Sequence, residues 1–81
     1  MSERGLALPI WRTPDGEPVS CLEKIKVLND NLREIRDLAE DALADAVLMG
    51  CDDAQFRQVL HDLAEGLVNP YRTDAGKKGA V

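Results

Sequence analysis

The chain has 81 residues and a formal charge of −5, from ten Lys and Arg against fifteen Asp and Glu. A chain of this length forms one domain and buries only about 60% of its unfolded surface, so a metal, disulfides or a partner subunit is often needed for stability. The acidic balance repels a phosphate backbone and argues against nucleic-acid binding. No apolar run is long enough for a signal peptide or a membrane helix, which predicts a cytoplasmic protein without a membrane segment.

Residues 1–19 are predicted to form an irregular N-terminal segment with a turn. They contain three of the four prolines and the sequence TPDGEP. Pro14 presets the φ angle that a turn needs, and Gly16 accepts a positive φ angle. We therefore expect the chain to reverse direction near Asp15.

A long helix is predicted over about residues 20–49. Ser20 and Glu23 have the spacing of a capping box, and Gly50 supplies the residue with positive φ that commonly closes a helix. Between them, small and apolar side chains recur at alternating steps of four and three residues, which is heptad spacing. This heptad stripe consists of Cys21, Ile25, Leu28, Leu32, Ile35, Ala39, Ala42, Ala46 and Met49.

A shorter helix is predicted over about residues 53–68. Asp52 has N-cap chemistry and Gln55 stands three residues later, while Asn69 and Pro70 are expected to end the helix. One face of this helix is apolar, with Phe56, Leu60, Leu63 and Leu67. The prediction is a helical domain over residues 20–71, followed by a flexible, disordered tail over residues 72–81.

The short connection between the two helices predicts an all-α fold, an antiparallel helical hairpin. The second helix is too short to cover the whole heptad stripe, and we expect it to pack on the small residues Ala39, Ala42 and Ala46. The other half of the stripe presents Ile25, Leu28, Leu32 and Ile35. Burying these four side chains is worth roughly 6–12 kcal/mol, comparable to the net stability of a whole domain.

Two covers are available for that uncovered half. The N-terminal segment can fold back and lay Leu6, Leu8, Ile10 and Trp11 over it, which gives a monomer. Alternatively, a second copy can cover it and form a dimeric four-helix bundle. Residues 20–36 contain four basic side chains, whereas residues 37–53 contain six acidic side chains and no basic one. Because an antiparallel pair places each basic half beside an acidic half, we predict an antiparallel homodimer.

Few residues have the chemistry of a site. Glu34, Asp37, Asp41 and Asp45 share one helical face, which is predicted to be a solvated face or a docking surface, since the Glu-x-x-His pair of carboxylate metal sites is missing. His61 is expected at the surface. Cys21 lies at a helix start near Lys24, where a thiolate is favoured, and Cys51 is the other candidate for redox chemistry.

These features predict a function based on docking. The sequence contains no pairing of a nucleophile with a base, no phosphate-binding glycine loop and no metal motif, so no catalytic, cofactor or metal residue is predicted. We expect a small helical protein–protein interaction module, an accessory or regulatory subunit that binds another protein. The alternative is a small redox or metal-linked protein that uses Cys21 or Cys51.

Overall fold

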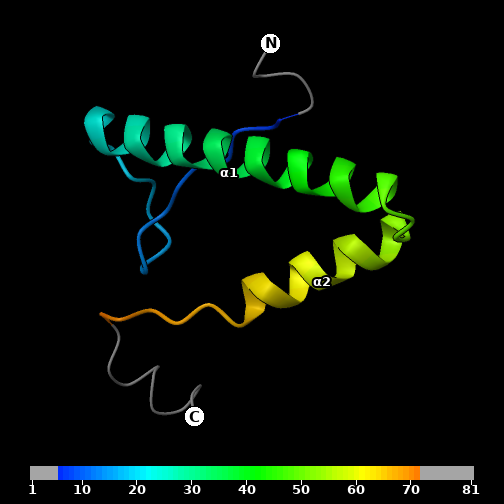
Figure 1. Ribbon diagram of the computed structural model, residues 1–81. Coiled ribbons are helices and arrows are strands. Elements are labelled where there is room, and N and C mark those ends of the chain that lie inside the picture. The colour runs from blue at the N-terminus through cyan, green and yellow to red at the C-terminus, as the bar shows by residue number, and fades with distance from the viewer. Residues whose placement is uncertain (1–5, 72–81) are drawn as a thin grey trace. The chain divides into compact units, whose positions relative to one another are not determined.

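The computed structural model describes residues 6–71, and these residues contain two helices (Figure 1). Helix α1 spans Leu22–Leu48 and helix α2 spans Asp53–Glu65. The predicted all-α fold is confirmed: a long helix, a short connection and a shorter helix follow one another in the order of a helical hairpin. No strand occurs in this part of the chain, where a single antiparallel bridge joins Arg12 and Pro18. The predicted tail over 72–81 lies outside the described residues.

The chain divides into two compact units, and the division falls within α1, between Ala44 and Asp45. The predicted divisions lie elsewhere, after residues 19 and 71. The first unit contains the N-terminal segment and most of α1, and the second contains the last turn of α1, the connection and α2.

The predicted turn in the N-terminal segment is confirmed. The Gly16 N–H donates to the Thr13 carbonyl at 2.8 Å, and Gly16 has a φ angle of 91°. Pro14 and Asp15 are therefore the central residues of a β-turn that is followed by a residue of positive φ. The flanking residues pair through Thr13 N–H to Glu17 O and Val19 N–H to Trp11 O, both at 2.8 Å.

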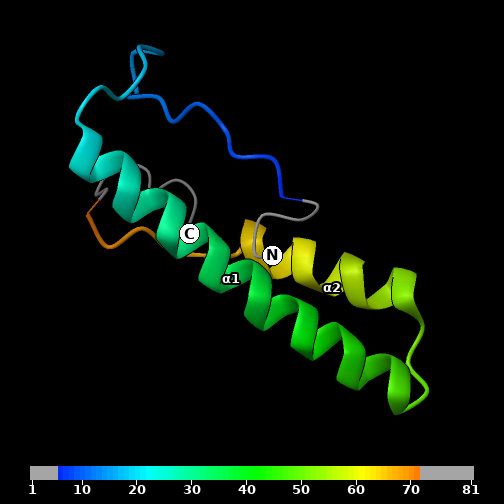
Figure 2. The ribbon, with the colours of Figure 1, turned by 90° about the horizontal axis from the view of Figure 1, so that it is seen from above.

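This segment then lies beside α1. Figures 1 and 2 show the chain running along the helix, looping near its first turn and entering it. Trp11 anchors the segment, since its indole N–H donates to Asn29 Oδ1 at 2.8 Å. The structure thus shows the fold-back only in part: Leu6 and Trp11 are half-buried, whereas Leu8 is 40% exposed and Ile10 is 67% exposed. The predicted homodimer stays a proposal.

Helix α1 begins at Leu22, two residues after its predicted start. The Ile25 N–H donates to the Cys21 carbonyl at 3.0 Å, which makes Cys21 the N-cap residue, and not Ser20 as predicted. The helix ends as expected before Gly50, whose φ angle is 94°. Gly50 N–H bonds to Val47 O and Cys51 N–H to Ala46 O, the pair of bonds that defines a Schellman motif.

Helix α2 begins where the sequence predicts, and it ends earlier. The Asp52 carboxylate accepts a hydrogen bond from the Gln55 N–H at 2.9 Å, as an N-cap residue does. The helix ends at Glu65 with Gly66 as its C-cap, three residues before the predicted end. Glycine is a poor helix former, and it stops α2 before Asn69 and Pro70 can.

The described part of the chain has no fully buried residue. Half-buried residues of α1 recur on one face, at Ile25, Leu28, Leu32, Arg36, Ala39, Leu43 and Ala46. Ala42, which was expected inside, is exposed, and Leu43 is half-buried instead. A straight helix has 3.6 residues per turn, so a heptad stripe drifts around it by about 20° per heptad. Beyond Leu32 the half-buried face therefore includes Arg36 and Leu43 in place of Ile35 and Ala42.

Candidate functional site

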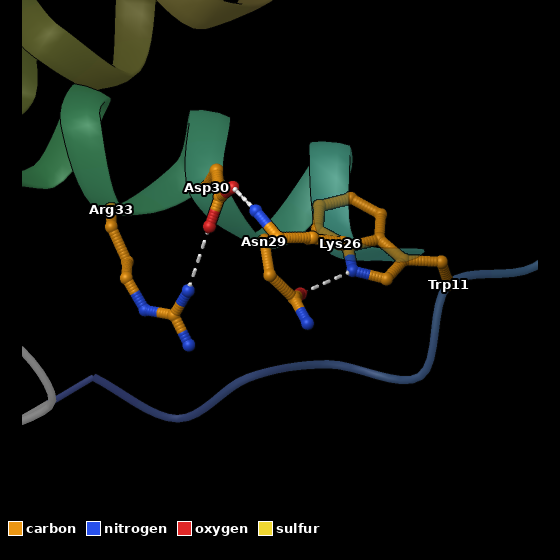
Figure 3. A network of polar contacts seen from close by, with 5 residues as sticks. All are labelled: Trp11, Lys26, Asn29, Asp30 and Arg33. Atoms are coloured by element: carbon orange, nitrogen blue, oxygen red, sulfur yellow. Dashed lines mark hydrogen bonds and ion pairs between the residues drawn. The ribbon is translucent and has the colours of Figure 1, made fainter. Parts of the chain in front are cut away.

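Polar contacts gather on the first half of α1, and one of them, between Trp11 and Asn29, joins the N-terminal segment to the helix (Figure 3). Beside the bond from Trp11 to Asn29, Asp30 accepts from Lys26 Nζ at 2.7 Å and from Arg33 Nη1 at 3.1 Å. The hydrogen bond from Lys26 lowers the pKa of the Asp30 carboxyl, and the charges of Lys26 and Arg33 add to this effect. The ion pairs of Asp30 lie within α1, and the bond from Trp11 is the contact that ties the N-terminal segment to it.

Three of the four predicted apolar interaction residues lie on the half-buried face. Ile25, Leu28 and Leu32 are half-buried, whereas the Ile35 side chain is 62% exposed. The structure therefore separates Ile35 from the other three. The drift of the heptad stripe explains this separation, because Ile35 turns away from the covered face.

Sequence reasoning missed an exposed apolar face on α1. Leu38 is 71% exposed and Val27 is 56% exposed. Together with Ile35 they lie at positions 27, 35 and 38, within one side of the helix at 100° per residue. The signal was present in the sequence, because residues eight and three positions apart lie on one side of a helix with 3.6 residues per turn. It was overlooked because Val27 and Leu38 lie outside that stripe.

The four predicted acidic residues are all exposed along α1: Glu34, Asp37, Asp41 and Asp45. Asp37 accepts a hydrogen bond from Arg36 Nε at 2.7 Å. Within residues 6–71, no group of three or more His, Cys, Asp or Glu side chains is arranged to hold a metal ion. The acidic face is thus available for contact with a partner, and its carboxylates do not converge.

Cys21 is an exposed free thiol at the start of α1. Its pKa is lowered, chiefly by the backbone N–H of Lys24 and then by the N–H of Glu23 and the charge of Lys24, while desolvation acts in the opposite sense. An open groove beside the thiol is lined by residues that include Val27 and Leu28. The arrangement favours a thiolate, as the position at a helix start predicted.

Cys51 and His61 belong to the second unit. Cys51 is a half-buried free cysteine in the connection, with its Sγ atom 3.6 Å from Gln55 Oε1. His61 is exposed, as expected, and its ring nitrogens lie 3.7 Å from Asp62 Oδ1 and 3.8 Å from Glu65 Oε2. Both contacts of His61 come from its own helix, so this cluster holds no residue from another element.

The comparisons with known proteins add no relative to these observations. No family model, curated protein or solved structure matches the chain. Neither helix in the described part of the chain is long and apolar enough to cross a membrane.

Proposed function

We propose that this chain is a small helical protein–protein interaction module, an accessory or regulatory subunit without catalytic activity. The observation that carries the proposal is the exposure of large apolar side chains on both helices, among them Leu38 on α1 and Leu63 on α2. Exposed apolar faces of this kind mark sites of interaction with other proteins. The partner is another protein, and a second copy of the chain is one such partner.

The charge of the surface supports the same function. Charged residues make up 31% of the chain, and residues 37–48 of α1 include acidic side chains but no basic one. A polar, charged rim around an apolar centre is the usual composition of a protein interface. The free thiols of Cys21 and Cys51 fit a reducing compartment, and we place the protein in the cytoplasm.

An affinity experiment in the native host tests this function. The tagged chain should recover a protein in stoichiometric amount, and the variants Leu38→Asp and Leu63→Asp should each reduce that recovery if the face they alter is used. His61→Gln is a control, because this exposed side chain lies near Asp62 and Glu65 of its own helix and outside both leucine positions. Recovery that is unaffected by both leucine variants would contradict docking through these faces.

The alternative function is a small redox or metal-linked protein, and the exposed Cys21 thiol with its lowered pKa favours its redox form. The rate of alkylation against pH decides between the two functions. A redox thiol must react well below the pH at which an ordinary cysteine reacts, and its oxidation must change the behaviour of the protein. Cys21→Ser provides the comparison, with Cys51→Ser as the matched control.

A further inference from the structure

One side of α1 forms a continuous exposed row that we name the Ile35–Leu38 face. Its members follow at steps of three and four residues, and all are exposed: Lys24, Val27, Asn31, Ile35, Leu38, Ala42 and Asp45. Leu38 comes nine residues, or two and a half turns, after Asn29, so the two lie on opposite sides of the helix. Because Asn29 holds Trp11, the N-terminal segment lies on the side of α1 away from Leu38.

The face is complementary to itself. Ile35 is the middle residue of Leu22–Leu48. Lys24 precedes Ile35 by eleven residues and Asp45 follows it by ten, which is about 16 Å and about 15 Å along the helix. A twofold axis near Ile35 therefore brings the apolar centre of one copy onto that of the other, and it sets each Lys24 opposite the Asp45 of the second copy.

The charges at the two ends have no competing ion-pair partner within residues 6–71. Neither Lys24 nor Asp45 makes an ion pair with another residue of the part that the structure describes. A parallel pair would instead set Lys24 against Lys24 and Asp45 against Asp45. The helix macrodipoles also favour the antiparallel arrangement, because each end of one α1 then lies beside the opposite end of the other.

We propose that a second copy of this chain covers the Ile35–Leu38 face, with the two α1 helices antiparallel. The inference rests on the proposed interaction function and names the partner of its α1 surface. It also moves the seam of the dimer from Ile25, Leu28 and Leu32, which lie on the half-buried side of α1, to the neighbouring exposed side of the helix. Asn31 lies within the new seam, where a polar residue restricts the register of two helices.

Charge reversal tests the pairing. In Lys24→Glu, and separately in Asp45→Lys, two repulsive contacts form in each dimer, and the dissociation constant should rise about tenfold or more. In the double variant the charges are complementary again, so the constant should return to within about threefold of the original value. Sedimentation equilibrium at low salt measures all four proteins. A double variant that dimerises no better than the single variants would overturn the antiparallel pairing.

Substitution in the apolar centre tests the face itself. Leu38→Asp should make the chain monomeric at concentrations where the original protein is a dimer. Leu22→Asp is the matched control, because Leu22 is an 80% exposed leucine of the same helix that lies on the far side from Leu38, and it should stay dimeric. Dimers that survive Leu38→Asp, or that are lost in Leu22→Asp alone, would overturn the inference.

Light scattering and the affinity experiment together distinguish the proposed dimer from the proposed interaction function. If the original chain is a monomer by light scattering at about 100 µM, where micromolar dimers are formed, the second copy is the wrong occupant. A host protein whose recovery is lost in Leu38→Asp and kept in Leu22→Asp would then leave the interaction function standing. Circular dichroism of each variant checks that the helices remain folded.

Discussion

Trp11 is the only tryptophan of the chain, and the hydrogen bond from its indole N–H to Asn29 joins the N-terminal segment to α1. This makes its fluorescence a direct probe of the fold-back. In Asn29→Ala the indole N–H loses its acceptor, which should cost about 0.5–1.5 kcal/mol and shift the emission to longer wavelength as water reaches the ring. Asn31→Ala, on the exposed side of the same helix, should leave the emission unchanged. Equal spectra for the two variants would contradict the anchoring role of Asn29.

The ion pairs of Asp30 should make the stability of the folded chain depend on pH. The pKa of Asp30 is lower in the folded chain because Lys26 donates to the carboxylate. The ionised carboxylate therefore stabilises the fold above the ordinary aspartate pKa, and this contribution is lost as the pH falls through the lowered pKa of the folded chain. Thermal unfolding followed by circular dichroism should therefore show a loss of stability on the acid side. Asp30→Asn should weaken this dependence, whereas the control Glu34→Gln should preserve it, since Glu34 is exposed one turn further on.

At the scale of the helices, the two glycines that follow α1 and α2 differ in conformation. Gly50 has a φ angle of 94°, whereas Gly66 lies at −91°. Gly50→Ala should therefore cost about 1–2 kcal/mol, because a side chain opposes the left-handed conformation. At Gly66 a Cβ atom would stand 3.5 Å from the Asp62 carbonyl oxygen, an ordinary contact, and Gly66→Ala should be neutral or stabilising. Urea unfolding of both variants measures the difference.

Helix ends were predictable where the signal is local. Gly50 ends α1 and Asp52 caps α2 as the sequence indicates, because each acts through hydrogen bonds to residues a few positions away. The predicted end of α2 was wrong because Gly66 ends the helix before Asn69 and Pro70 are reached. Helix α1 begins at Leu22, two residues after the predicted start, because Cys21 occupies the N-cap position.

The covered side of α1 was only partly predictable. A heptad pattern identifies a helix and the approximate position of its inner face, and Ile25, Leu28 and Leu32 are indeed half-buried. Beyond Leu32 the inner face depends on the true pitch of the helix and on what packs there, which no local pattern contains. Ile35 and Leu38 consequently belong to an exposed face that the heptad stripe did not predict. The lowered pKa of the Cys21 thiol, by contrast, could be expected from its position at the start of the helix.

At the scale of the whole molecule, deletion of the N-terminal segment should affect stability and pairing differently. Deleting residues 1–12 removes Trp11 and uncovers Ile25, Leu28 and Leu32, so the truncated chain should melt at lower temperature and form particles larger than a dimer. The Ile35–Leu38 face is untouched, and pairing through it should persist. Light scattering against concentration measures both effects. A truncated chain with unchanged size and melting temperature would show that the segment covers nothing of consequence.

The connection between α1 and α2 has a consequence for folding kinetics. Its backbone bonds join residues no more than five positions apart, as from Cys51 to Ala46, and the cap from Asp52 reaches only to Gln55. Contacts this close in sequence form within microseconds, since little loop entropy is lost in making them. The association of two chains requires a diffusive encounter and is slower. At concentrations where the proposed dimer forms, refolding should therefore show a fast phase that is independent of concentration, in which helices form. A second phase should follow, with a rate that rises with protein concentration.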